Sequence, residues 1–254
     1  MKIVVIGGTG LIGRGVVDLL QKGGHDVVPA SPSTGVDSVT GRGVAEALEG
    51  ADVVIDIPNS PSFADDAVMD FFRRSTGNLV EAATHAGVGH YLVLSIVGAD
   101  RMPDIGYMRA KVAQEGIVTG SGLPFSVIRA TQFFEFVPAL AEGAAEGDVI
   151  RMSPVLMQPI AAADVSAALA DAAIQPPSNG ITELAGPEQL RLADLATSIL
   201  ASRGDTRRVV SDPTVGYFGG VVNDTSLIPG QDPRITELHL GATRFDEWLA
   251  RSAK

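Results

Sequence analysis

The sequence MKIVVIGGTGLIG, residues 1–13, joins a short apolar run to a glycine-rich turn. The run from Lys2 to Ile6 is rich in β-branched residues, which favours a strand. Gly7, Gly10 and Gly13 follow at three-residue intervals and lead into apolar residues at helical spacing. In such a strand, turn and helix, backbone N–H groups can approach a pyrophosphate at the positive end of the helix.

The stretch therefore predicts a dinucleotide-binding turn, and a tight βα turn without a ligand is the alternative. The residues expected to contact the cofactor here are Gly7, Thr9, Gly10, Leu11, Ile12 and Gly13.

Composition narrows the possible functions of the chain. Its 254 residues suffice for one α/β domain and a smaller lobe. It has no cysteine, which excludes disulfides, thiol catalysis and cysteine-bound metals. A formal net charge of −11 disfavours nucleic acid and anionic membranes, and the four scattered histidines indicate no metal site. Without a signal sequence or membrane-spanning run, we expect a cytoplasmic protein that binds a small-molecule substrate.

Strand and helix patterns alternate along the first half of the chain. The apolar strand candidates are Lys2–Ile6, Asp26–Ala30, Asp52–Ile57, Tyr91–Ser95 and Phe125–Arg129. The helical stretches between them are Ile12–Lys22, Arg42–Glu49, Asp65–Ala86 and Gly106–Thr119. This order predicts a doubly wound parallel sheet, the Rossmann fold, over residues 1–130.

A small C-terminal α/β lobe for substrate is expected over residues 131–254, interleaved with the last elements of the core. Its helices are expected at Pro138–Ala145, Ala161–Ala173, Leu192–Arg203 and Phe245–Ala250, and its strands at Val149–Met152 and Ile181–Leu184. The glycine- and proline-rich segment Gly216–Pro233 is expected to be mobile.

The end of the second strand bears on the choice of cofactor. A carboxylate there would bind a ribose 2′-hydroxyl, but none occurs between Asp26, which opens the strand, and Asp37. Ser31, Ser33 and Thr34 instead leave room for a 2′-phosphate, so NADP(H) is preferred over NAD(H). Ordinary turn residues are the alternative interpretation of these three hydroxyls.

Two further strand ends are expected to reach the nicotinamide half of the cofactor. Ile57, Pro58 and Asn59 close one strand, and Ser95 closes the next. Tyr107 and Lys111 come twelve and sixteen residues after Ser95 and lie on one face of a helix. A tyrosine donates a proton more readily when a nearby ammonium lowers its pKa, and a serine can hold a carbonyl oxygen. Ser95, Tyr107 and Lys111 are the candidate catalytic residues, whereas an i,i+4 surface pair is the alternative for the last two.

The chain resembles the short-chain dehydrogenase/reductase superfamily, and within it the atypical NmrA-like, NAD(P)-binding branch. The glycine turn, Ser95 and Tyr107-Met-Arg-Ala-Lys111 carry the first resemblance. Segments 121–134, 160–165 and 185–188 carry the second. The resemblance implies that Lys111 holds the nicotinamide ribose and that Asp37 lies near the adenine. It also implies that some members of the branch are redox sensors without catalysis.

The substrate side is expected at Phe133, Phe134 and Phe136, because they follow the fifth strand in a chain poor in aromatic residues. An apolar pocket suits a quinone or another flat carbonyl compound, although packing in an ordinary core is the alternative for each ring. The sequence thus predicts an NAD(P)H-dependent oxidoreductase. A redox-sensing regulator and an isomerase or epimerase that uses the nucleotide transiently are the other two hypotheses.

Overall fold

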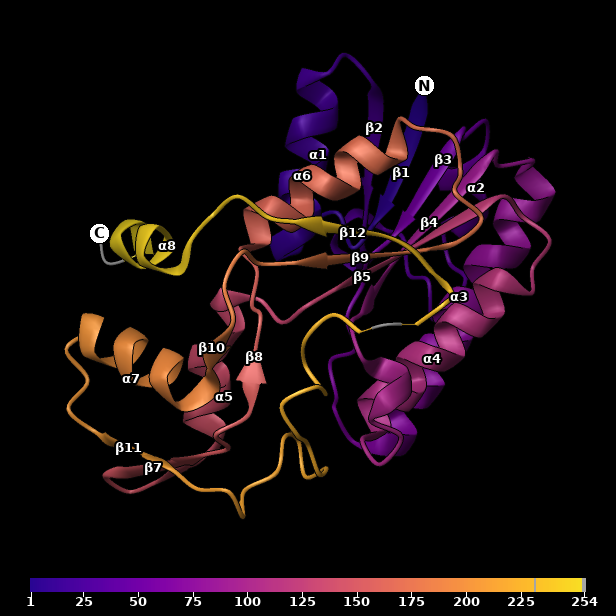
Figure 1. Ribbon diagram of the computed structural model, residues 1–254. Coiled ribbons are helices and arrows are strands. Elements are labelled where there is room, and N and C mark those ends of the chain that lie inside the picture. The colour runs from indigo at the N-terminus through magenta and orange to yellow at the C-terminus, as the bar shows by residue number, and fades with distance from the viewer. Residues whose placement is uncertain (231, 253–254) are drawn as a thin grey trace.

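A seven-stranded parallel sheet forms the centre of the molecule in the computed structural model, which describes residues 1–230 and 232–252. The strand order is β12-β9-β5-β4-β3-β1-β2, shown in Figure 1. The strands are β1 (Lys2–Ile6), β2 (Asp26–Ala30), β3 (Val53–Asp56), β4 (His90–Ile96), β5 (Phe125–Ala130), β9 (Ile181–Ala185) and β12 (Ile235–Leu240). Because β2 and β3 lie on opposite sides of β1, a crevice opens beyond the carboxyl ends of β1 and β3.

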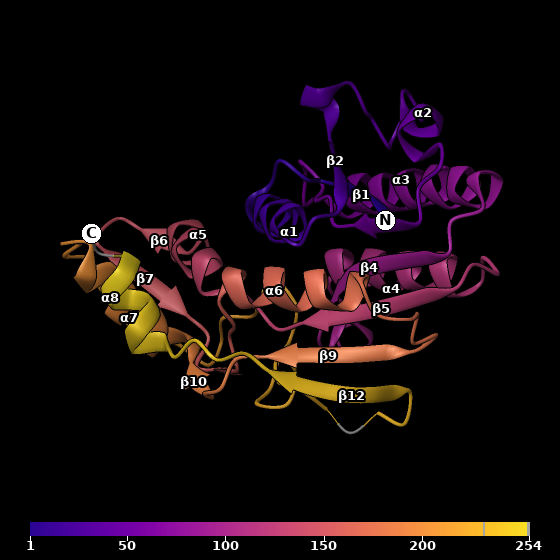
Figure 2. The ribbon, with the colours of Figure 1, turned by 90° about the horizontal axis from the view of Figure 1, so that it is seen from above.

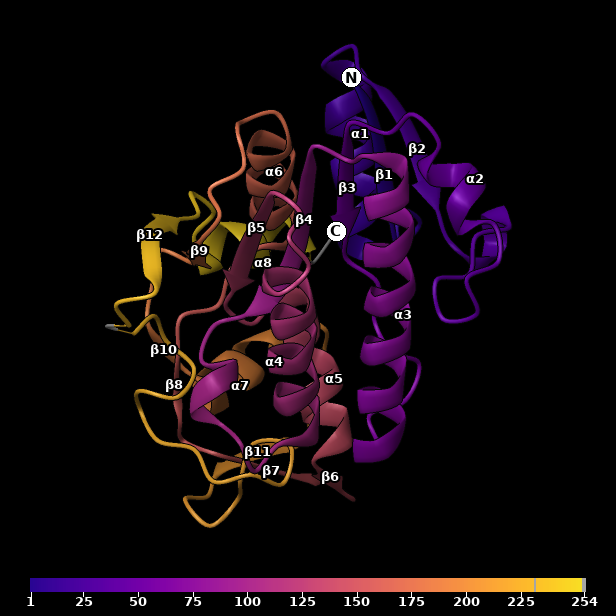
Figure 3. The same cartoon turned by 90° about the vertical axis from the view of Figure 1, so that its right-hand side faces the viewer.

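Helices cover both faces of this sheet, which confirms the predicted doubly wound fold. On one face lie α1 (Leu11–Lys22) and α6 (Ala162–Ala173), which share a buried core with the sheet. On the other face lie α2 (Val44–Leu48), α3 (Asp65–Ala86) and α4 (Gly106–Thr119). Figure 3 shows α3 and α4 side by side along this second face. Strands buried on both faces explain the continuous apolar runs in their sequences.

The C-terminal lobe lies beyond the carboxyl ends of β5, β9 and β12, toward which their arrows point in Figure 2. Its helices are α5 (Val137–Gly143), α7 (Leu192–Ser202) and α8 (Phe245–Ser252). Its short strands are β6 (Ala145–Glu146), β7 (Val149–Met152), β8 (Leu156–Met157), β10 (Leu190–Arg191) and β11 (Arg208–Ser211). The 3₁₀ turns are η1 (Pro32–Thr34), η2 (Ala99–Arg101) and η3 (Phe134–Phe136). The lobe places a second apolar core next to the crevice.

Several elements differ from the sequence-based expectation, among them the short lobe strands β6, β8, β10 and β11, which were not predicted. Strand β12 was not predicted, because its residues are mostly exposed and lack the apolar run of a central strand. Helix α2 begins at Val44 rather than Arg42, since Gly43 has a φ of +72° and Arg42 pairs with Asp37. Segment 216–233, expected to be mobile, has no helix or strand among its described residues but buries Tyr217 and Leu227. Residue 231 lies outside the description.

Candidate active site

A cavity of about 480 Å³ lies at the carboxyl ends of β1, β3, β4 and β5. It brings together most of the predicted site residues: Gly7, Thr9, Gly10, Leu11, Ile12, Gly13, Ser31, Ile57, Pro58, Asn59, Ser95, Tyr107, Lys111, Phe133 and Phe136. Four predicted residues do not line it: Ser33, Thr34, Asp37 and Phe134. The crevice expected from the strand order is therefore continuous with the aromatic residues of the C-terminal lobe.

The glycine turn packs too closely for larger residues. Gly7 has a φ of +84°, and a Cβ there would lie 2.9 Å from the carbonyl oxygen of Ile57. A Cβ on Gly13 would lie 2.1 Å from the carbonyl oxygen of Gly7, so a side chain would force α1 away from the turn. Helix α1 starts at Leu11, and its first N–H groups are unpaired within the helix. The turn thus has the close packing and helix terminus that a pyrophosphate requires.

The residues after β2 form a self-contained turn. Thr34 accepts a hydrogen bond from the Ser31 backbone N–H (2.9 Å), and its hydroxyl also lies 3.1 Å from the Pro29 carbonyl oxygen. The Ser31 and Ser33 hydroxyls are 2.8 Å apart. Asp37 accepts backbone hydrogen bonds beyond this turn, and the Thr40 hydrogen bond holds the pKa of its carboxyl low. Only Ser31 of the three hydroxyl residues reaches the cavity.

Two buried polar side chains at the cavity have no hydrogen-bond partner among the described residues. The Ser95 hydroxyl is one, and its residue is 2% exposed. The amide of Gln132 is the other, with both its nitrogen and its oxygen unpaired. Buried polar atoms are normally paired, so an unpaired group that lines a cavity indicates a ligand. Gln132 lies within segment 121–134, which carries the family resemblance, but it was not assigned to the site because a glutamine alone indicates no particular chemistry.

Tyr107 does not have the lowered pKa that would help its hydroxyl to donate a proton. Its hydroxyl donates a hydrogen bond to Asn59 Oδ1 at 2.8 Å. Burial raises the pKa of Tyr107, whereas the expected effect of a nearby ammonium was to lower it. Burial of the hydroxyl is the cause of the raised pKa, and the Lys111 ammonium, described next, binds other groups. The expectation of a lowered tyrosine pKa is thus wrong for this structure.

Lys111 is 5% exposed and reaches the cavity from α4. Its Nζ donates to the Leu94 carbonyl oxygen at 2.7 Å and to the Gln114 side-chain oxygen. The same nitrogen lies 4.4 Å from the centroid of the Phe72 ring, whose face stabilises a cation. Burial lowers the pKa of Lys111 to about 8, and Asp56 and Glu115 oppose this change.

Aromatic rings from separate segments form one wall of the cavity. Phe218 stacks between Phe136 and Phe63, with centroid distances of 6.0 and 6.1 Å. Phe63 also lies 5.4 Å from the Tyr107 ring. Phe218 has a φ of +49°, a rare conformation for a bulky residue and one found at ligand sites. Phe63 was missed in the sequence because it stands alone in a polar loop.

Phe134 lies in the core of the lobe instead of the cavity. It is 1% exposed, and its ring centroid is 5.2 Å from that of Trp248. The 3₁₀ turn η3 explains the separation, because adjacent side chains in such a turn point in different directions. Phe133 and Phe136 consequently face the cavity while Phe134 packs under α8.

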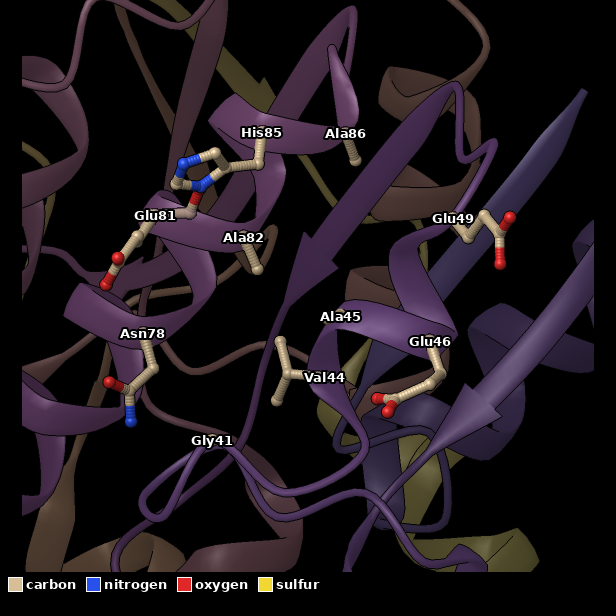
Figure 4. A pocket seen from close by; sticks show the side chains of 10 residues that line it. All are labelled: Gly41, Val44, Ala45, Glu46, Glu49, Asn78, Glu81, Ala82, His85 and Ala86. Atoms are coloured by element: carbon tan, nitrogen blue, oxygen red, sulfur yellow. The ribbon is translucent and has the colours of Figure 1, made fainter.

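A second hollow of about 580 Å³ lies between α2 and α3, remote from the glycine turn. Figure 4 shows its side chains, among them Glu46, Glu49, Glu81 and His85 around the apolar Val44. It shares no lining residue with the cavity at the strand ends. The hollow therefore does not extend the candidate site.

No described helix is long and apolar enough to cross a membrane. Within residues 1–230 and 232–252, no group of three or more His, Asp or Glu side chains is arranged to hold a metal ion.

The parallel sheet, the glycine turn and the cavity define a dinucleotide-binding α/β protein. Residues 7–176 match the model of the NAD(P)H-binding family, and the chain belongs to that family. This match confirms the resemblance to the NmrA-like, atypical short-chain dehydrogenase/reductases.

Two curated proteins are distant relatives. The chloroplastic divinyl chlorophyllide a 8-vinyl-reductase of Oryza sativa subsp. indica is 27% identical over 220 residues, covering 73% of this chain and 54% of the rice protein. The photosystem II assembly factor Ycf39 of Synechocystis sp. is 26% identical over 149 residues, covering 53% of this chain and 46% of that protein. The chain spans about half the length of these curated relatives.

A solved structure shares the fold over nearly the whole chain. The NADPH-dependent quinone oxidoreductase QOR2 of Escherichia coli has a TM-score of 0.69 and 20% identity, covering 99% of this chain and 100% of that one. At this identity the likeness concerns the fold alone.

Proposed function

We propose that this protein is an NAD(P)H-dependent oxidoreductase that reduces a small, flat carbonyl or quinone-like compound. One observation carries the proposal: the cavity at the glycine turn also contains the unpaired Ser95 hydroxyl, the Lys111 ammonium and a wall of aromatic rings. The residues fit a dinucleotide, because the turn excludes side chains and Ser95 and Gln132 present unpaired polar atoms. When bound, the nicotinamide would supply the hydride for the reduction.

Side chains of this protein would bind and orient the cofactor and substrate and supply the proton. Lys111 holds the ribose next to the nicotinamide and provides positive charge near the reacting carbonyl. Ser95 donates a hydrogen bond to the carbonyl oxygen. Tyr107 is the candidate proton donor from the same helix, and its hydroxyl must leave Asn59 to act. Phe136, Phe218 and Phe63 pack against the faces of a flat substrate.

For the cofactor we propose NADP(H) over NAD(H). The turn from Ser31 to Thr34 carries hydroxyls where NAD-binding folds place a carboxylate, so no negative charge opposes a 2′-phosphate there. The E. coli quinone oxidoreductase with the same fold is NADPH-dependent. The site residues outside the cavity, Ser33, Thr34 and Asp37, stay predictions for the adenosine end.

A fluorescence titration with NADPH and NADH tests the cofactor, and cofactor oxidation with quinones and ketones tests the reaction. We expect tighter binding of NADPH and turnover with at least one flat carbonyl compound. Equal or tighter NADH binding contradicts the cofactor preference. If neither nucleotide binds, the enzyme hypothesis fails.

A non-catalytic NAD(P)-binding regulator is the second candidate. The raised pKa of Tyr107 favours it, because a weaker acid donates a proton less readily. A regulator would bind both redox states of the cofactor without consuming either. An epimerase would change its substrate with no net consumption of cofactor. The oxidation assay therefore separates the oxidoreductase from the other two, and analysis of the substrate after incubation separates the epimerase from the regulator.

A further inference from the structure

A buried chain of polar side chains runs beneath the cavity from β3 to α4. At its start, Asp56 is fully buried, and its Oδ2 accepts hydrogen bonds from Tyr91 (2.9 Å), Gln114 (3.0 Å) and Thr76 (3.2 Å). Gln114, 1% exposed, accepts a hydrogen bond from Lys111 Nζ and so extends the chain to that residue. A carboxylate is thereby linked, through one amide, to the ammonium at the cavity.

Asp56 determines which way the Gln114 amide points. A carboxylate only accepts hydrogen bonds, so the NH₂ group of Gln114 must face it. The amide oxygen is then left to accept a hydrogen bond from Lys111 Nζ. With the amide reversed, its NH₂ group would face the ammonium and its oxygen would face the carboxylate, and both contacts would be repulsive.

Asp56 is the main carboxylate whose negative charge offsets the positive charge of the buried Lys111 ammonium. Two carboxylates act on Lys111, Asp56 from β3 and Glu115 from its own helix. Glu115 is engaged by Arg129, which donates to both of its oxygens at 2.9 and 2.7 Å. From the elements packed against Lys111, α3 contributes Thr76 and the Phe72 ring, while β4 contributes Tyr91, whose pKa is raised well above its usual value. Asp56 is therefore the carboxylate whose charge is not already paired with a guanidinium.

Three donors on one oxygen favour the ionised form of Asp56, although burial raises its pKa. We propose that Asp56 is a positioning residue that acts through Gln114 to keep Lys111 charged and directed at the cavity. The proposal rests on the role of Lys111 in the proposed function. It predicts that loss of the Asp56 charge makes Lys111 give up its proton at lower pH.

The substitution Asp56→Asn separates charge from shape. An asparagine oxygen can accept the same three hydrogen bonds, and its NH₂ group takes the place of Oδ1, which has no partner among the described residues. The titration of Lys111 can be followed directly by NMR of protein labelled with ¹³C at lysine Cε. The chain has lysines only at positions 2, 22, 111 and 254, and the signal lost in Lys111→Met is that of Lys111.

We expect the Lys111 midpoint, near pH 8 in the natural protein, to fall by at least about one unit in Asp56→Asn. Gln114→Leu, which removes the bridging amide, should also lower it and serves if Asp56→Asn does not fold. The control Ser126→Ala removes a buried hydrogen bond to His90 at the opposite end of β4 and should leave the midpoint unchanged. An unchanged midpoint in folded Asp56→Asn or folded Gln114→Leu overturns the proposal.

NADPH affinity provides the functional comparison. Asp56→Asn should match the natural protein at about pH 6, where Lys111 is protonated in both, and bind about fivefold more weakly near pH 8. The NMR titration needs no cofactor. A protein that binds no nucleotide would therefore refute the proposed function, while the Lys111 midpoint still decides the role of Asp56.

Discussion

Lys111 and Tyr107 lie one turn apart on α4 but have different surroundings. Lys111 binds the end of β4 through the Leu94 carbonyl and lies over the Phe72 ring. The Tyr107 hydroxyl instead donates a hydrogen bond to Asn59 Oδ1, and its ring packs against Phe63. The two side chains therefore reach the same cavity without contacting each other's polar atoms, and their contributions can be separated by substitution.

Lys111→Met should weaken NADPH binding and abolish most turnover, because it removes the buried ammonium at the cavity. Tyr107→Phe should leave binding intact and, if the hydroxyl donates the proton, reduce kcat by about 10²–10⁴-fold. Fluorescence titration and steady-state kinetics measure the two effects. Near-full activity of Tyr107→Phe together with an inactive Lys111→Met would assign catalysis to the lysine alone. Full activity of both variants would refute the site assignment.

A buried group of charges joins β5 to α4 and η2. Arg129, 1% exposed, binds Glu115 on α4 through two nitrogens and Asp100 on η2 at 3.0 Å. Asp100 also pairs with Arg234, just before β12. Arg129 and Glu115 are withdrawn from water and stabilise each other, whereas Arg234 at the edge of the group is 59% exposed. Removal of Arg129 leaves the Glu115 carboxylate, whose side chain is only 9% exposed, without its guanidinium partner.

Arg129→Met should therefore lower the free energy of unfolding by about 3–5 kcal/mol. The matched control is Arg109→Met, which breaks an ion pair of 2.7 Å with Asp65 whose side chains are 40% and 62% exposed. That change should cost only about 0–1 kcal/mol, because water and salt screen an exposed pair. Urea denaturation of the two variants gives both values. Similar losses in both would contradict the assigned role of burial.

The sheet and the C-terminal lobe of the whole molecule are interleaved in sequence. Beyond residue 130 the chain builds part of the lobe, returns to the sheet for α6 and β9, and returns once more for β12. The single tryptophan, Trp248 on α8, donates to Glu135 at 2.9 Å, and Glu135 lines the cavity and accepts from the first residue of α6. Neither part can lose its structure without removing elements from the other.

Unfolding should consequently be a single transition. Fluorescence of Trp248 reports on the lobe, and far-ultraviolet circular dichroism reports mainly on the sheet and its helices. We expect the two urea curves to have the same midpoint, as two-state unfolding requires. A lobe that melts at lower urea than the sheet would show that the interleaved elements do not couple the two cores.

Local patterns in the sequence determined the central fold and much of the site. The β-branched run at Lys2–Ile6 and the glycines at 7, 10 and 13 predict a strand, turn and helix because each depends on near neighbours in the chain. The same is true of the long amphipathic helix Asp65–Ala86, whose bounds match the prediction. Strand β12 escaped prediction because an exposed edge strand has no apolar period to detect.

Only the tertiary structure decided which side chains meet. Phe63 and Phe218 are far apart in the sequence but stack at the cavity, whereas Phe134, between two cavity residues, turns into the lobe. The link from Asp56 through Gln114 to Lys111 spans two elements and appears only when β3 packs beside α4. Burial in the folded protein raises the pKa of Tyr107, whereas its spacing from Lys111 in the sequence suggested a lowered pKa. Contacts and desolvation depend on the folded surroundings of a residue, and one sequence does not contain those surroundings in its local pattern.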